Sequence, residues 1–253
     1  MDLWQLLIYG LIGLAGGTLS GLIGIGGGAI FVPALVYVAG WSIKDATAAS
    51  LFTFVFGALS GTLRSLRSEN PVDWKAVALL TSVVAPSALV GVTINRFSPE
   101  FLVQLAFAAF LIILAYPVAY ARPPAAEGSR RIPRALMLLA GVGVGTMAGL
   151  VGIGGTVLMI PLLVLGLGLR VKTAMATSLA ITIFTGIVGS AGYVIAGFAQ
   201  LSSLPPLIVG AILGAWLGAS SRERVPETVL QRGFALFMVL LAVRIVVDAV
   251  SGL

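Results

Sequence analysis

The chain has 253 residues, of which 59% are hydrophobic and only 9% are charged. A soluble domain carries about 25% charged residues, because polar side chains must cover its exterior. The mean hydropathy is +1.11, and apolar runs long enough to cross a bilayer recur along the chain. These values predict an all-α integral membrane protein. They exclude a soluble enzyme, a nucleic-acid-binding protein and a disordered regulator.

Cysteine and histidine are both absent from the chain. Disulfide bonds, Cys/His metal sites, haem ligation and thiol chemistry are therefore excluded. The sequence predicts no metal site, no cofactor and no catalytic residue.

The first part of the chain is repeated in the second. When the sequence is shifted by 128 residues, 11–51 aligns with 139–179 without a gap, and 19 of the 41 positions are identical. After one deletion the match resumes at an offset of 127, where a Pro-Glu-x-x-x-Gln pattern at 99–104 recurs at 226–231. The unbroken register and the second shared pattern predict a duplication.

The duplication divides the chain into a first membrane repeat (1–121), a cytoplasmic linker (122–133) and a second membrane repeat (134–253). The linker combines Pro, Gly and several charges, which indicates a solvated segment. Each repeat contains five apolar segments. We expect them at 3–20, 29–41, 46–66, 75–95 and 100–121, and at 134–148, 156–168, 173–196, 203–221 and 227–250.

The second segment of each repeat is too short to cross a hydrocarbon layer, which needs about 20 helical residues. Each short segment follows a glycine cluster. It is either the returning limb of a re-entrant hairpin or the second part of a broken spanning helix. Three further transmembrane helices are expected in each repeat.

The distribution of basic residues indicates one membrane topology. If the first two segments of each repeat form a re-entrant pair or two crossings, one side holds eleven Lys and Arg residues, in the loops at 64–75, 121–134, 169–172 and 221–226. The other side then has only Lys44 and Arg96, whereas counting each pair as one crossing divides the same residues seven to six. The positive-inside rule favours the first arrangement, with both termini outside. Each repeat then crosses an odd number of times, so we expect the two repeats to have inverted topology, as in many secondary transporters.

Two glycine clusters, Gly21–Gly28 and Gly149–Thr156, form the candidate substrate site. Glycine allows positive φ and close approach of the backbone to a ligand. Each cluster leads into a short helix, so free N–H groups and the positive dipole end would bind an anion near the midplane without charged side chains. The predicted substrate-binding residues are Gly24, Gly26, Gly27, Gly28, Ser50, Gly152, Gly154, Gly155, Thr156 and Ser178.

The alternative role for glycine is packing. Glycines recur at four-residue spacing over 13–21 and over 141–149, a pattern that usually marks close helix contact. We expect packing for residues 13–17 and 141–145, and a substrate-facing role for the Gly-Ile-Gly-Gly pieces that follow.

The motif Gly-x-x-Gly-Ile-Gly-Gly-(x)5-Pro occurs at 21–33 and again at 149–161, each time followed by Lys-x-Ala-x-Ala-x-Ser-Leu. In this doubled motif, and over essentially the whole chain, the sequence resembles the TauE/SafE sulfite exporter (TSUP) family. The resemblance implies a multi-pass protein of the cell membrane that exports or takes up sulfur-containing anions such as sulfite, sulfoacetate or other organosulfonates. It does not settle which of these is carried.

Equivalent lysines stand six residues before the two equivalent serines. The residues predicted to line a vestibule or gate are Lys44, Thr47, Lys172 and Thr177. The simpler explanation of the two lysines is that they lie at the membrane interface and set the depth of their helices. Hydroxyls on apolar helices often bond to their own backbone, but the equivalence of Ser50 and Ser178 strengthens the case for ligand contact.

No Asp or Glu stands in the middle of an apolar segment, so a carboxylate proton relay is not expected. The predicted function is a secondary transporter that binds an anion between the two glycine clusters and works by alternating access. The alternatives are an anion channel, a permease for another small carboxylate and, less favoured, an intramembrane enzyme. The expected partners are the small anionic substrate and the lipid bilayer, with no nucleic acid. Direction, coupling ion and formation of a homo-oligomer stay open.

Overall fold

The computed structural model describes residues 3–23, 28–66, 72–120, 133–152, 154–197, 201–221 and 227–251. Within these ranges the protein is helical and has no strand. The first five helices are α1 (Leu3–Ile23), α2 (Gly28–Tyr37), α3 (Ile43–Ser65), α4 (Trp74–Phe97) and α5 (Glu100–Tyr120). The rest are α6 (Arg134–Val151), α7 (Thr156–Leu167), α8 (Val171–Ile195), the short 3-10 helix η1 (Leu201–Ser203), α9 (Leu204–Ser221) and α10 (Glu227–Ser251).

The ten predicted segments correspond one to one to α1–α10. The largest difference is in α2, which ends at Tyr37, four residues before the expected end. Beside the glycine clusters, α1 and α6 each continue three residues beyond the expected end, to Ile23 and Val151. The first glycine of each cluster is therefore still helical. At the start of α3, Ser42 accepts a hydrogen bond from the backbone N–H of Asp45, and Glu100 accepts one from the backbone N–H of Ile43. These acceptors satisfy N–H groups that the helix itself leaves unpaired.

Six helices in the described residues are long and apolar enough to cross a membrane, namely α1, α3, α4, α6, α8 and α9. The helices α2 and α7 have 10 and 12 residues, so the expectation that these two segments are too short to span is confirmed. The predicted fold class, an all-α integral membrane protein, is confirmed.

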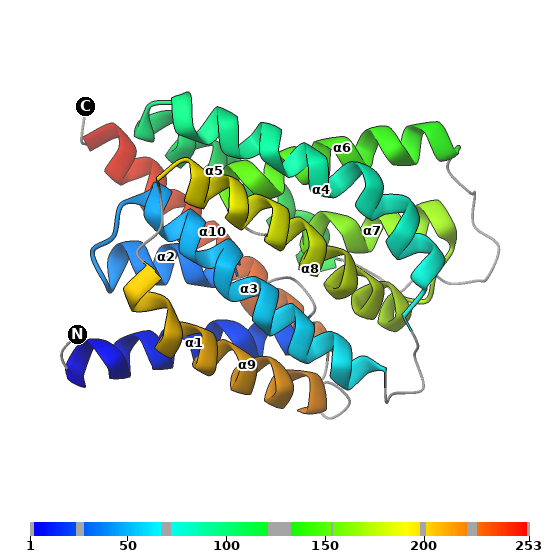
Figure 1. The fold of residues 1–253 in the computed structure, drawn as a ribbon, viewed down its shortest axis with the longest axis horizontal. Coiled ribbons are helices and arrows are strands. Elements are labelled where there is room, and N and C mark those ends of the chain that lie inside the picture. The colour runs from blue at the N-terminus through cyan, green and yellow to red at the C-terminus, as the bar shows by residue number, and fades with distance from the viewer. Residues whose placement is uncertain are drawn as a thin grey trace.

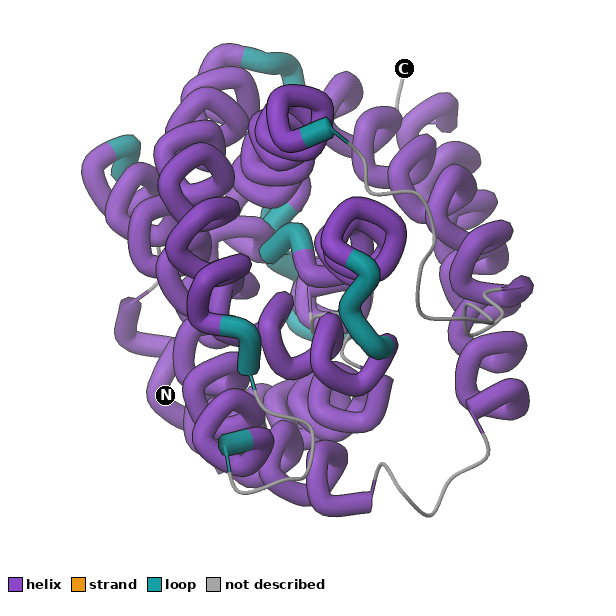
Figure 2. The backbone as a smooth tube through the Cα atoms, turned by 90° about the vertical axis from the view of Figure 1, so that its right-hand side faces the viewer, coloured by secondary structure: helices purple, strands orange, loops and turns teal. Residues whose placement is uncertain are grey.

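Helices of the two repeats pack across the repeat boundary. The central pair is α3 and α8, α1 packs on α9, α6 packs on α4, and α5 packs on α10 (Figure 1). The first helix of each repeat thus lies against the fourth helix of the other repeat. Figure 2, the view from the right-hand side of Figure 1, shows several helices nearly end-on, as expected for a bundle whose helices share one general direction.

Glycine stripes bring the α1 and α9 backbones together. A Cβ at Gly17 would overlap the backbone of Ala211 in α9, and a Cβ at Gly214 would overlap the backbone of Leu14 in α1. The same arrangement joins α6 to α4, where a Cβ at Gly145 would overlap the backbone of Val84. Van der Waals contact between backbones is a main source of helix association in lipid. The packing role predicted for these stripes is confirmed.

Replacing a stripe glycine should lower the amount of folded protein. We expect Gly17→Leu and Gly145→Leu to force the helix pairs apart and to reduce the folded yield severalfold, because overpacking a tight contact costs about 1–3 kcal/mol or more. The matched control is Gly143→Leu, since Gly143 lies on α6 with no atom within 4 Å of an added Cβ. The measurement is the monodisperse fraction in detergent by size-exclusion chromatography. Equal yields for Gly143→Leu and Gly145→Leu would contradict the packing role.

Candidate anion-binding site

The second glycine cluster forms the turn between α6 and α7. Gly152, Gly154 and Gly155 have φ values of 74°, 72° and 76°. Side-chain-bearing residues rarely adopt this left-handed backbone, so the sequence can make this turn only with glycine. The irregular backbone predicted for this cluster is confirmed. We call residues 152–155 the glycine turn, of which Ile153 lies outside the described residues.

The glycine turn lies at mid-depth in the bundle. A Cβ at Gly154 would come within 2.9 Å of the ring of Phe54 and within 2.8 Å of the methyl of Thr182. Phe54 is the middle residue of α3 (Ile43–Ser65), and Thr182 is one residue from the middle of α8 (Val171–Ile195). Because α3 and α8 are both long enough to span, this part of the turn lies near the middle of the membrane.

Two hydroxyl groups hold the backbone of the turn. Ser50 Oγ on α3 donates to the carbonyl oxygen of Gly152 at 2.7 Å, and both residues are buried. The single hydroxyl hydrogen of Thr182 on α8 is shared between two acceptors, the carbonyl oxygen of Gly154 at 3.1 Å and that of Ser178 in its own helix at 2.9 Å. The turn is therefore tied to both central helices by side chains.

Two further side chains hold the end of α6 just before the turn. Tyr193 Oη on α8 donates to the carbonyl oxygen of Gly149, and Asn95 Nδ2 on α4 donates to that of Leu150, each at 2.7 Å. The last carbonyls of a helix have no partner within the helix, so these bonds satisfy groups that would otherwise be costly to bury. We call Ser50, Asn95, Thr182 and Tyr193 the four carbonyl donors.

Thr156, the first residue of α7, carries the polar group most suited to a ligand. Its side chain is fully buried, and among the described residues its Oγ1 has no hydrogen-bond partner. It follows Gly155, the N-cap of α7, directly. The N–H groups of a first helical turn also lack intrahelical partners and carry the positive end of the helix dipole. The first turn of α7 has no acidic residue and the last turn of α6 has no basic one.

Lys44 and Thr47 lie at the start of α3. Lys44 Nζ donates to the carbonyl oxygen of Ser98 at 2.8 Å and is 3.4 Å from that of Arg96, so the ammonium group binds the C-terminal end of α4. Thr47 donates to its own helix at Ile43, and its methyl group is 2.7 Å from where a Cβ of Gly152 would lie. The vestibule role of both residues stays a prediction.

The remaining predicted residues lie on α8 and α2 or outside the described residues. Ser178 donates to the carbonyl of Met175 in its own helix, Thr177 accepts from the backbone N–H of Asp73, and Lys172 is exposed in the first turn of α8. Gly28 is buried and begins α2. Gly24, Gly26 and Gly27 lie outside the described residues, so the expected meeting of the two glycine clusters stays a prediction.

The structure adds two residues that sequence reasoning did not select. Asn95 and Tyr193 both contact the backbone of the second glycine motif from other helices. A polar amide near the end of an apolar segment was the available signal for Asn95. For Tyr193 the sequence offers no comparable signal, because tyrosine is common near helix ends in membrane proteins.

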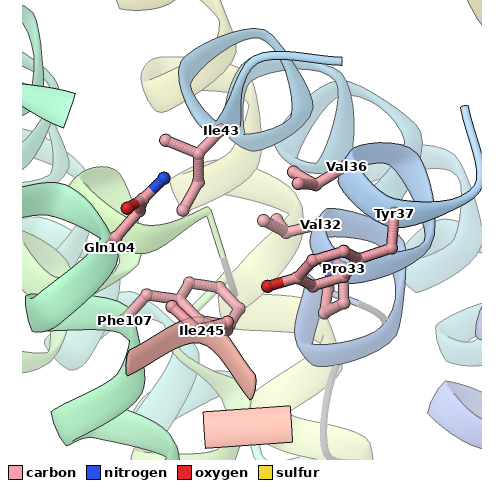
Figure 3. Close-up of a pocket in the computed structure, with 8 residues that line it drawn as sticks. All are labelled: Val32, Pro33, Val36, Tyr37, Ile43, Gln104, Phe107 and Ile245. Carbon is pink, nitrogen blue, oxygen red and sulfur yellow. The ribbon is translucent and has the colours of Figure 1, made fainter. Parts of the chain in front are cut away.

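A small apolar cleft lies elsewhere, between α2 and α3 on one side and α5 and α10 on the other. It is lined by Val32, Pro33, Val36, Tyr37, Ile43, Gln104, Phe107 and Ile245 (Figure 3). The Tyr37 hydroxyl is hydrogen-bonded to the Asp248 carboxylate, and Asp248 pairs with Arg244 at 3.2 Å. This polar cluster joins the end of α2 to α10. The apolar lining makes the cleft a poor anion site.

The comparisons with known proteins decide the family. The family model described as sulfite exporter TauE/SafE matches residues 9–245. The chain belongs to the sulfite exporter TauE/SafE family. The resemblance expected from the doubled motif is therefore confirmed, and the chain is a multi-pass membrane protein of a transporter family.

Several relatives of the TauE/SafE chain have transporter names. A probable membrane transporter protein of Haemophilus influenzae is 28% identical over 253 residues, which cover 92% of this chain and 95% of the relative. The probable membrane transporter protein YunE of Bacillus subtilis is 27% identical over 265 residues, which cover 95% of this chain and 97% of YunE. Sulfite exporter TauE/SafE family protein 5 of Arabidopsis thaliana is 30% identical over 107 residues, 42% of this chain and 24% of that protein. No solved structure matches the chain.

The steric enclosure of the glycine turn can be tested separately from the strain of its backbone conformation. Gly154 and Gly168 have nearly equal φ values of 72° and 69°, but an added Cβ at Gly168 meets no atom within 4 Å. We expect Gly168→Ala to cost only the backbone strain, about 1–2 kcal/mol. Gly154→Ala should cost more, because its Cβ would press on Phe54 and Thr182. The measurement is the melting temperature of both variants in detergent. Equal losses would show that the turn is not tightly enclosed.

Proposed function

We propose that this TauE/SafE protein is a secondary transporter of small sulfur-containing anions, such as sulfite, sulfoacetate or other organosulfonates. The anion binds at the glycine turn and the start of α7. The observation that carries this proposal is the fully buried hydroxyl of Thr156 at the N-terminus of α7, which has no hydrogen-bond partner in the described part of the chain. An oxyanion supplies acceptor atoms for that hydroxyl and for the N–H groups of the first turn. The family and the names of the relatives support the transport of a sulfur anion.

The chemistry of this site favours anions of single charge. The N–H groups and the helix dipole each contribute on the order of 0.3–1 kcal/mol, and up to about 2 kcal/mol when partly buried. That is too little to offset the desolvation of a small doubly charged ion. A monoanion, or an anion whose second charge stays hydrated in an aqueous vestibule, fits the site better.

Alternating access follows from the inverted repeats that the sequence predicts. In Figure 1 α1 runs from left to right and α6 from right to left, and α3 and α8 run in opposite directions in the same way. A cleft separates α2 and α3 from the packed pair of α5 and α10. We take this cleft as the seam, the boundary along which the α5–α10 pair moves relative to the other helices. Opening this seam on one side and closing it on the other would expose the turn to each side of the membrane in succession.

The charged helix ends support one orientation in the membrane. The last turn of α3 carries Arg64, the start of α4 carries Lys75 and α6 starts at Arg134, and these ends lie at the right of Figure 1. By the positive-inside rule, this end of the bundle faces the cytoplasm. Both ends of the helical chain, the start of α1 and the end of α10, lie at the left of Figure 1.

Labelling tests the orientation and the inverted repeats together. We expect a cysteine introduced at Ser129 to react with a membrane-impermeant maleimide only from the cytoplasmic side. A cysteine at Ser202 should react only from outside. The chain has no native cysteine, so each variant carries one reactive thiol. Labelling of both positions from the same side would reject the topology.

Flux in proteoliposomes tests the substrate and the site. We expect uptake of sulfite or of an organosulfonate by the wild type. We expect an apparent affinity at least about tenfold weaker in Thr156→Val, because a hydrogen bond to a charged group contributes about 1.5–3 kcal/mol. Gly155→Leu should abolish uptake.

Thr81→Val is the control for Thr156→Val. It removes another buried hydroxyl that has no partner among the residues the structure describes. Thr81 lies on α4, two helical turns before Ala88, whose backbone packs against Gly149 of α6. Transport by this variant should match that of the wild type. Failure of the wild type to carry any of the sulfur anions, or equal effects of the two valine variants, would reject the proposal.

A further inference from the structure

The carbonyl oxygens around the glycine turn are largely occupied. The four carbonyl donors bind the carbonyls of residues 149, 150, 152 and 154. The carbonyl of Gly155 accepts from the backbone N–H of Met159 in α7 at 3.0 Å. The hydroxyl of Thr156 and the N–H end of α7 lie on the same segment and are not used in this way. The turn therefore offers donors to a ligand and keeps most of its acceptors bonded.

Free carbonyl oxygens at an unwound helix are the groups with which secondary transporters bind Na⁺. A donor hydrogen placed against each carbonyl occupies one of its two lone pairs and puts partial positive charge where a cation would lie. The same bonds offset the negative partial charge of the carbonyls, so the N–H groups contribute more to the potential at the turn. The sign of the accepted charge thus depends on side chains that do not themselves carry charge.

We propose that the four carbonyl donors set the charge selectivity of this site. Ser50, Asn95, Thr182 and Tyr193 act as positioning residues: they bind the backbone carbonyls, and through them they exclude Na⁺ and admit anions. This inference rests on the proposed function in one respect, that the glycine turn is the substrate site. It gives a new role to Ser50, whose hydroxyl orients the backbone of the turn.

The chain offers matched controls for this role. Thr185 lies one helical turn after Thr182 on α8 and is fully buried, but its hydroxyl bonds to its own helix at Ile181, so Thr185→Val removes a hydroxyl without freeing a turn carbonyl. Thr182→Ser keeps the donor that Thr182→Val removes.

The experiment compares uptake of radioactive Na⁺ and of sulfite by the full chain in proteoliposomes. Ser50→Ala and Thr182→Val should raise Na⁺ uptake severalfold above the wild type. They should weaken the apparent affinity for sulfite by about tenfold, the scale of one lost hydrogen bond at a charged site. The order of preference among anions should not change, because no direct contact with the anion is lost. Thr185→Val and Thr182→Ser should behave as the wild type in both assays.

Ser50→Cys covers the case in which Ser50→Ala fails to fold. A thiol has nearly the same size and is a weak donor, so this variant should show an intermediate rise in Na⁺ uptake. Folded Ser50→Ala or Ser50→Cys with the Na⁺ uptake of the wild type would overturn the inference. A change in the order of preference among anions, without Na⁺ uptake, would overturn it in favour of direct contact between Ser50 and the substrate.

The outcome separates this inference from the proposed function. A wild type that carries no sulfur anion rejects the proposed function. A wild type that carries sulfite, together with donor variants that still exclude Na⁺, rejects only the role of the four carbonyl donors.

Discussion

Hydrogen bonds from side chains to backbone carbonyls hold the glycine turn inside the bundle. A bilayer has no water to satisfy an unwound backbone, so a break between α6 and α7 at mid-depth requires partners from neighbouring helices. Ser50 on α3, Asn95 on α4, and Thr182 and Tyr193 on α8 supply them. Each donor is a neutral side chain, so the bonds add no formal charge at the centre of the membrane.

These bonds depend in turn on how closely the helices approach. The backbone of α6 lies against that of α4 because Gly145 and Gly149 have no side chain at the contact. With larger residues there, α6 would be displaced from α4, and the amide of Asn95 would no longer reach the carbonyl of Leu150. Glycine therefore has two roles in one motif. It permits close packing before the turn and positive φ within it.

Charged groups in the described residues lie mainly toward the helix ends. Lys44 binds the C-terminal carbonyls of α4, Asp73 caps the N-terminus of the same helix, and Glu100 accepts from the N-terminus of α3. These bonds satisfy polar groups at the ends of the helices near the membrane surfaces. The interior is left to hydroxyl, amide and backbone groups, which suits an ion that must bind weakly enough to leave.

The sequence by itself determined the membrane class, the ten helical segments and the family. Low charge, apolar run length and the duplicated Gly-Ile-Gly-Gly motif are local properties that a linear pattern records directly. It also located the turn at 152–155, because the positive φ values at 152, 154 and 155 are ones that glycine adopts readily.

Only the tertiary structure decided which side chains meet that turn. Asn95 and Tyr193 lie tens of residues away from it in sequence, and the hydroxyl of Ser50 bonds across 102 positions to Gly152. Ser50 and Ser178 are equivalent in the duplicated sequence, yet one donates to the turn and the other to its own helix. A repeat pattern in the sequence cannot distinguish these two serines, because the acceptor of each hydroxyl depends on the distances and directions that helix packing sets.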